Sequence, residues 1–238
     1  MTPAIVRERI AALQLSGIRL GTLPAEPVRR LPTGIGELDE LLGGGLPRGH
    51  LSEIVGGPSS GRTGLLHALL ASATQRGEVA AVVDLTDTLD PPSLARAGAD
   101  LERVLWVRPP APQTALKCAE LILNAGGFGL VALDGLGSGR PLTRQVWPRL
   151  AQVARRGSAA CVVCAPRRLS EGAAALALTL AQRRTHWSGR VFDGITSTAV
   201  LTRHRFGPTG AAVSVAFSGQ PSAISCQRSA VSFIKART

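Results

Sequence analysis

The stretch Gly56-Gly57-Pro58-Ser59-Ser60-Gly61-Arg62-Thr63 decides the fold of this chain. It follows the P-loop pattern G-x-x-x-x-G-K-[S/T], except that Arg62 stands where the pattern has lysine. Amides of such a loop and of the helix that follows it hold phosphates, while the hydroxyl binds magnesium. Leu51–Val55 is strand-like and an apolar helical stripe follows the loop, so the flanking sequence predicts the strand-loop-helix unit that the motif requires.

The run Gly129–Leu133 ends in Asp134 and supplies the second half of the signature. A short apolar run is typical of a buried parallel strand, and a carboxylate at its end can reach the water shell of Mg²⁺. We therefore expect ATP and Mg²⁺ as cofactors, with Thr63 and Asp134 as metal ligands. The nucleotide-binding residues that this signature predicts are Gly56, Ser59, Ser60, Gly61, Arg62, Thr63 and Asp134.

The arginine in the loop alters the expected chemistry. Its planar guanidinium is broader than the compact ammonium of lysine, which must enter a narrow ring of amides. We expect nucleotide binding to survive this exchange and fast hydrolysis to be lost. A Gly-Ser turn that holds no ligand is the alternative interpretation of the motif.

The chain has 238 residues, 45% of them hydrophobic, which suits one α/β domain with a full core. No secretory signal pattern begins the sequence and no apolar run approaches the ~20 residues that span a bilayer. We therefore expect a cytoplasmic, nucleoid-associated protein without membrane contact. Four cysteines in that compartment do not indicate disulfides. Cys161 and Cys164, three apart on a core-like strand, face opposite ways and are expected to be buried thiols.

Basic residues are concentrated in the second part of the chain. Residues 1–134 carry twelve Lys/Arg against fourteen Asp/Glu, whereas residues 135–238 carry fifteen against two, a net charge of +13. This part is predicted to bind a polyanion, either DNA without sequence preference or an acidic protein; a solvated basic rim is the alternative. With 3% aromatic residues and no Tyr, stacking on single-stranded bases is poorly provided for. The candidate DNA- or partner-binding residues are Arg155, Arg156, Arg167, Arg168, Arg183 and Arg184.

Hydrophobic periodicity divides the chain into an N-terminal helix and linker (1–30), a core domain (31–217) and a flexible C-terminal tail (218–238). Strands expected at 79–84, 103–107, 129–134 and 159–164 alternate with helices expected at 62–76, 91–98, 112–125 and 142–156. This alternation predicts a mainly parallel sheet flanked by helices. Antiparallel strands are expected at the C-terminal end of the domain, at 176–180, 197–205 and 211–217.

The order of these motifs resembles the core of the RecA family through most of 31–217. The residues that carry the resemblance are Leu31-Pro32-Thr33-Gly34, the segment 42–49, the P-loop, Val83-Asp84 and Asp134. The resemblance implies a RecA-like P-loop core, ATP binding, DNA binding and a role in DNA repair. It also implies that Arg203 and Arg205 contact ATP held by a neighbouring protomer. Two outward charges on an exposed strand are the alternative for this pair.

Departures from the RecA pattern concern hydrolysis. Thr86 stands at the place of the catalytic glutamate, and Pro166 stands at the place of the glutamine that senses the terminal phosphate. Asp87 is the only acid beside Thr86 and is the candidate catalytic residue. The segments 135–141 and 166–172, which match the loops that hold DNA, are short. We therefore leave enzymatic activity open and expect ATP hydrolysis to be impaired or absent.

Short chains with these changes resemble the ImuA family, accessory proteins of bacterial SOS mutagenesis cassettes. The resemblance implies an accessory role in translesion synthesis, with DNA and with translesion polymerase components or a RecA-like protein as partners. The alternative function is an active DNA-dependent ATPase of recombinational repair. A helical pattern at 4–13 has an apolar stripe too small for a domain, which favours self-association through this helix; folding back onto its own core is the alternative.

Overall fold

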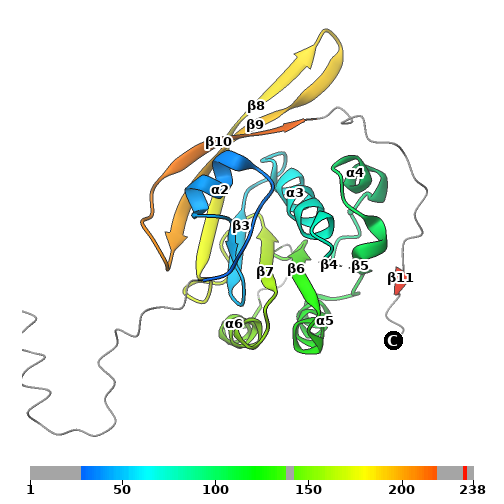
Figure 1. Cartoon of the computed structure of the whole chain (residues 1–238), viewed down its shortest axis with the longest axis vertical. Helices are drawn as coiled ribbons and strands as arrows, with labels where there is room; N and C mark the ends of the chain where they lie inside the picture. The colour runs from blue at the N-terminus through cyan, green and yellow to red at the C-terminus, as the bar shows by residue number, and fades with distance from the viewer. Residues whose placement is uncertain (1–27, 138–141, 219–232, 235–238) are drawn as a thin grey trace, which may run out of the picture.

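The structure, a computed structural model, describes residues 28–137, 142–218 and 233–234. The helix expected at 4–13 and most of the expected tail lie outside these residues. Within them, a nine-stranded sheet has the order β10-β9-β8-β3-β7-β6-β4-β5-β11 (Figure 1). The strands are β3 (Leu51–Val55), β4 (Val79–Asp84), β5 (Val104–Val107), β6 (Phe128–Asp134), β7 (Ala160–Ala165), β8 (Leu176–Ser188), β9 (Val191–His204), β10 (Ala212–Ser218) and β11 (Phe233–Ile234).

The sheet combines a parallel centre with an antiparallel end. The strands from β8 through β5 run parallel, and β11 adds a short parallel strand on β5. β9 and β10 continue the sheet beyond β8 as antiparallel strands. This arrangement confirms the α/β fold with antiparallel strands at the C-terminal end of the domain. A separate two-stranded ladder pairs β1 (Arg30–Leu31) with β2 (Leu46–Pro47).

Helices cover both faces of the sheet. On one face lie α2 (Gly36–Leu42), α3 (Arg62–Gln75) and α4 (Pro91–Arg96), packed on a core that includes Leu66. On the other lie α5 (Pro112–Ala125) and α6 (Val146–Arg156), packed on a core that includes Leu150. A short 3-10 helix, η1 (Leu101–Arg103), precedes β5. Cys161 and Cys164 are both buried on opposite faces, and burial raises the pKa of the Cys161 thiol to about 12.

Residues 166–175 connect β7 to β8 across β3 without a helix. Glu53 of β3 is fully buried and accepts hydrogen bonds from the amides of Leu169 and Ser170. The Ser170 hydroxyl donates to the same carboxylate at 2.8 Å, and Arg168 Nε lies 3.5 Å from it. The Glu53 carboxylate therefore accepts hydrogen bonds from the backbone of the β7–β8 connection and pairs with its arginine. In this way one buried strand residue holds in place a segment that has no helix or strand.

The elements expected around the P-loop are confirmed, with bounds that differ by a few residues. α4 ends at Arg96 and not at 98, and α6 begins at Val146 and not at 142. The largest difference concerns β8 and β9, which continue through 181–196 as a long hairpin where the sequence pattern predicts no strand. Figure 1 shows this hairpin projecting beyond the layers of helices.

Candidate nucleotide site and basic surface

The P-loop joins β3 to α3 and adopts the backbone that an anion-binding loop needs. Ser59 and Gly61 have left-handed φ values of 56° and 88°, and a Cβ added at Gly56 would overlap the Ser60 side chain. No side chain caps α3 at Gly61, and its first turn holds no acidic residue. The first amides of a helix have no partner within the helix, so this end of α3 presents donors and a positive dipole to an anion. The loop therefore fits a phosphate group.

Arg62 is folded back onto the loop that carries it. Its Nη1 donates a hydrogen bond to the carbonyl oxygen of Gly56, and its Nε lies 3.9 Å from Asp134 Oδ1. The side chain is 22% exposed, so these contacts form in a partly desolvated place. A guanidinium in this position must exchange both contacts before it can bind the outer phosphates of a nucleotide.

Two carboxylates lie at the ends of neighbouring strands beside the loop. Asp84 on β4 and Asp134 on β6 are register partners. Burial is the main cause that raises the pKa of Asp134, and the charge of Asp84 adds to it. The amide of Gly135 and the charge of Arg62 act in the opposite direction. Two carboxylates that repel each other at a partly buried place attract a cation. The Asp134 carboxylate and the exposed hydroxyl of Thr63 are oxygen ligands of the kind that Mg²⁺ takes.

An apolar wall from the C-terminal strands faces the P-loop. Phe192 and Ile195 of β9 and Phe217 of β10 line a cavity of about 270 Å³ with residues 57–64. Phe217 lies so close to Gly64 that a Cβ added there would be 2.7 Å from the ring. The sequence pattern did not predict these contacts, and the glycine at position 64, directly after Thr63, is the one local signal of a close approach.

Strand β9 is also tied to the loop by a buried hydrogen bond. The Ser197 hydroxyl donates to the backbone carbonyl of Ser60 at 2.7 Å. Both residues are buried. The P-loop is therefore held between its own helix and a strand that follows it by more than a hundred residues.

Asp87, the candidate catalytic residue, lies in the loop after β4. It has a left-handed φ of 53°, and its carboxylate is 58% exposed and 3.3 Å from Arg108 Nη1. Thr86, at the place of the catalytic glutamate, donates its amide and its hydroxyl to Asp84. Asp87 thus contacts an arginine on the β5 side of the sheet, and its catalytic role stays a prediction.

The structure places Arg203 and Arg205 in different surroundings. Arg203 donates from Nε to the Ala174 carbonyl at 2.6 Å and from Nη2 to the Gly172 carbonyl at 3.0 Å. Arg205 follows the end of β9 and lines a cavity of about 400 Å³ with Arg155. Arg203 would have to release two carbonyls of its own chain before it could reach a neighbour's nucleotide.

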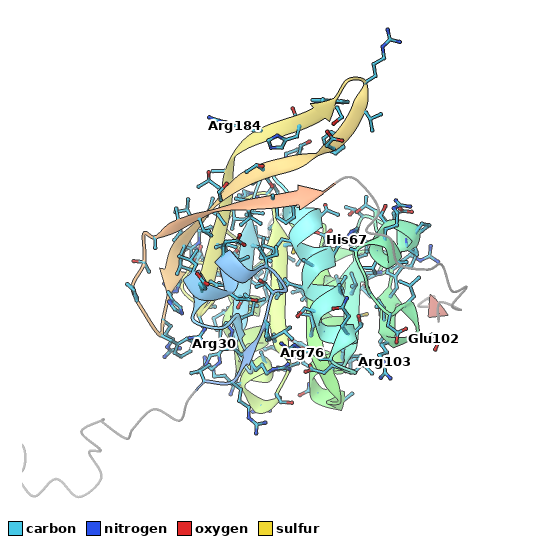
Figure 2. The ribbon with its side chains drawn as sticks, turned by 45° about the horizontal axis from the view of Figure 1, so that its top comes forward. Arg30, His67, Arg76, Glu102, Arg103 and Arg184 are labelled. Atoms are coloured by element: carbon cyan, nitrogen blue, oxygen red, sulfur yellow. The ribbon has the colours of Figure 1, made fainter. Side chains whose placement is uncertain are left out.

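The candidate DNA- or partner-binding arginines belong to three segments. Arg155 and Arg156 are exposed at the end of α6. Arg167 and Arg168 are exposed on the β7–β8 connection, where Arg168 also contacts Glu53. Arg184 is exposed on the β8–β9 hairpin (Figure 2). The side chain of Arg183, on the same strand, lies outside the described part of the structure.

Sequence comparison identifies the family from the part of the chain that holds this site. The family model described as RecA N-terminal domain matches residues 13–144, more than half of the chain, including the P-loop and Asp134. The chain belongs to the RecA family. It is 38% identical over 122 residues to Protein RecA of Clavibacter michiganensis subsp. michiganensis (strain NCPPB 382), and 39% identical over 120 residues to Protein RecA of Thermus thermophilus.

The first alignment covers 51% of this chain and 34% of the Clavibacter protein, and the second covers 50% of this chain and 35% of the Thermus protein. The chain therefore matches about a third of the length of these curated relatives. In structure, it aligns with the crystal structure of the RadB recombinase at a TM-score of 0.60 and 22% identity. That alignment covers 77% of this chain and 94% of the other, and it shows a shared fold. Within the described residues, no helix combines the length and the apolar character needed to cross a membrane.

Proposed function

We propose that this chain is a RecA-family accessory protein that binds DNA and partner proteins in the bacterial DNA-damage response, with impaired or absent ATP hydrolysis. The observation that carries the proposal is the position of Arg62, whose guanidinium is bound to the Gly56 carbonyl and lies beside Asp134. The basic residue of this P-loop is therefore occupied by the protein itself.

The residues around the P-loop are consistent with slow ATP hydrolysis. The position of the catalytic glutamate holds Thr86, which binds Asp84, and the nearby Asp87 is paired with Arg108. Pro166, at the place of the phosphate-sensing glutamine, has no side-chain donor. ATP would bind through the amides of the loop and of α3, with Mg²⁺ on Thr63 and Asp134. Bound Mg²⁺ would neutralise phosphate charge, while Thr86 and Pro166 stand at the two positions where the RecA pattern has a glutamate and a glutamine to position water and sense the phosphate.

Nucleotide binding and turnover test this proposal together. Calorimetry with ATP and Mg²⁺ is expected to detect weak binding, and turnover is expected to stay low whether or not single-stranded DNA is present. Arg62→Lys should tighten binding, because an ammonium enters the ring of amides more easily, and should leave turnover low, because Thr86 and Pro166 are unchanged. Failure to bind nucleotide at millimolar ATP would leave a purely structural partner with an empty loop.

An active DNA-dependent ATPase of recombinational repair is the second candidate. The observation that favours it is the pair Asp84 and Asp134 at the ends of adjacent strands, a suitable environment for a magnesium ion. This function requires turnover that rises strongly with single-stranded DNA and is lost in Asp134→Ala. That result would overturn the accessory role.

The partner proteins belong to the same proposal. An SOS and translesion role in the cytoplasm, at the nucleoid, requires capture of translesion polymerase components or of a RecA-like protein. The N-terminal segment is a candidate contact, so deletion of residues 1–22 is expected to lower partner capture or self-association and to leave the core folded. Unchanged light-scattering mass and capture, with a lower melting temperature, would instead show that the segment belongs to its own core.

A further inference from the structure

The β8–β9 hairpin exposes an apolar tip. β3 pairs with β8 only as far as Thr179, and β10 pairs with β9 only from Gly194 onward. Among the described strands, the turn-side part of the hairpin is therefore a two-stranded ribbon, which projects from the body in Figure 1. Its large side chains are exposed: Trp187 by 59%, Val191 by 58% and Phe192 by 38%.

Two of these side chains form an aromatic pair. Trp187 and Phe192 are register partners, with ring centroids 5.3 Å apart and ring planes at 70°. The edge-to-face contact fixes the rings on one face of the ribbon and leaves the indole open to solvent. An aromatic group exposed in this way contributes little to the fold, so a binding role accounts better for its position.

The hairpin is also positively charged. Asp193 is the only acidic residue in 176–204, against four arginines. Arg184 and Arg190 are exposed on the turn-side part of the hairpin, Arg184 three positions before Trp187 and Arg190 in the turn, and Arg184 lies outside the helical layers (Figure 2). Asp193 accepts a hydrogen bond from the Ser188 hydroxyl, so the one carboxylate also has a partner within the hairpin.

We propose that the hairpin tip binds single-stranded nucleic acid, with one base stacked on Trp187 and the backbone phosphates near Arg184 and Arg190. Stacking requires an unpaired base face, which single strands offer and a duplex does not. Arginine supplies the phosphate contacts, and the +13 charge of residues 135–238 attracts the same polyanion. A protein partner can also bury an exposed indole beside arginines, and the experiment below separates the two occupants. The inference rests on the proposed DNA binding and places one contact outside the segments expected from the RecA resemblance.

Tryptophan fluorescence reports this contact directly. The other two tryptophans, Trp106 and Trp147, are only 8% and 4% exposed, so quenching by DNA reports chiefly on Trp187. Titration of the full chain with an oligo(dT) of ~20 nucleotides at low salt is expected to quench this emission. In anisotropy with labelled oligo(dT), Trp187→Ala should bind about tenfold more weakly. Trp187→Phe should retain most of the affinity because phenylalanine also stacks.

Leu121→Ala is the matched control, because Leu121 is 70% exposed on α5 and its loss should leave DNA affinity unchanged. Arg184→Ala should make the dependence of affinity on salt less steep. Melting curves of Leu121→Ala and Arg184→Ala should coincide with that of the natural chain, and Trp187→Ala should melt only slightly lower, because it loses the ring contact with Phe192 at the exposed end of the hairpin.

Three results would overturn the inference. If the natural chain binds oligo(dT) without quenching, and Trp187→Ala binds equally well, the hairpin is not a contact although the proposed DNA binding stands. If the natural chain binds no DNA at low salt, the proposed DNA binding fails as well. If Trp187→Ala loses self-association or capture of a polymerase component and keeps its DNA affinity, the hairpin binds protein.

Discussion

Gly64 shows how one residue can reverse an ordinary helix rule. Glycine within a helix is usually less stable than alanine by roughly 0.5–1 kcal/mol. Here a Cβ would stand 2.7 Å from the Phe217 ring, so Gly64→Ala is expected to lower the free energy of unfolding by about 1–3 kcal/mol. In a Phe217→Ala background the loss should be much smaller, because only the Cβ of residue 217, 3.2 Å from the added Cβ, then remains. Urea denaturation of the two single variants and the double variant measures this coupling.

Gly36→Ala provides the control for that cycle. Gly36 begins α2 and has no heavy atom within 4 Å of an added Cβ. Its replacement should not destabilise the chain. Equal effects of Gly64→Ala with and without the Phe217 ring would show that the predicted clash does not exist.

Glu53 is the second residue whose replacement is expected to lower the free energy of unfolding strongly. Its carboxylate is fully buried and accepts hydrogen bonds from two amides and the Ser170 hydroxyl. Glu53→Gln keeps the shape but turns an amide NH₂ toward donors, so a loss of about 2–4 kcal/mol is expected. Glu102, an exposed glutamate on η1, provides the control (Figure 2). Glu102→Gln should leave the midpoint of urea denaturation unchanged. Similar midpoints for both variants would contradict this account of the β7–β8 connection.

At the scale of one element, α3 contains a buried histidine. Burial lowers the pKa of His67, and the nearby charge of Asp90 opposes this only in part. The unfolded chain therefore takes up a proton at a higher pH than the folded chain, and folding stability should fall as the pH drops below about 6.5. His67→Gln removes this contribution, so its stability should fall less steeply between pH 6.5 and 5. Parallel stability curves for the two proteins would refute the assignment.

The elements around the P-loop could be predicted because their signals are local. The stripe of buried leucines on α3 and the apolar run that ends in Asp134 each lie within a few turns or residues. The extended hairpin could not be predicted, because residues 181–196 bury little apolar surface and are held by pairing between strands. The low count of aromatic residues predicts little stacking on single-stranded bases. That count cannot show that one of them, Trp187, is exposed on a hairpin.

The candidate site divides in the same way. The loop, Thr63 and Asp134 could be predicted as one constellation from motif spacing. The contact of Phe217 with Gly64 and the bonds from Leu169 and Ser170 to Glu53 join residues more than a hundred positions apart. No periodicity reports such contacts, since they depend on the order of strands in the sheet.

At the scale of the whole molecule, the uneven charge predicts salt-dependent binding of DNA with little sequence preference. Affinity should fall steeply between low and physiological salt, because phosphate contacts release counterions. A variant with Arg155, Arg156 and Arg167 replaced by Gln should reduce the slope of log affinity against log salt by roughly 2 for a single strand. Arg168 is kept in this variant because it contacts Glu53.

Arg76→Gln serves as the matched control, since Arg76 is exposed at the end of α3 within the acidic part of the chain (Figure 2). Its salt slope should equal that of the natural chain. If the triple variant also keeps the natural slope, these arginines serve a protein and not a polyanion.

The place of β3 in the sheet fixes when the nucleotide site can exist. Its neighbours are β7 and β8, and the hydrogen bond from Ser197 to Ser60 spans 137 positions. During synthesis the P-loop strand therefore leaves the ribosome long before any strand that can pair with it. β4, β5 and β6 can pair with one another before β7 and β8 have been made, whereas the loop can form its hydrogen bond with Ser197 only after β9 has been made. A nucleotide can then stabilise only those nascent chains that already include β9, so its binding would report that these strands have been added to the sheet.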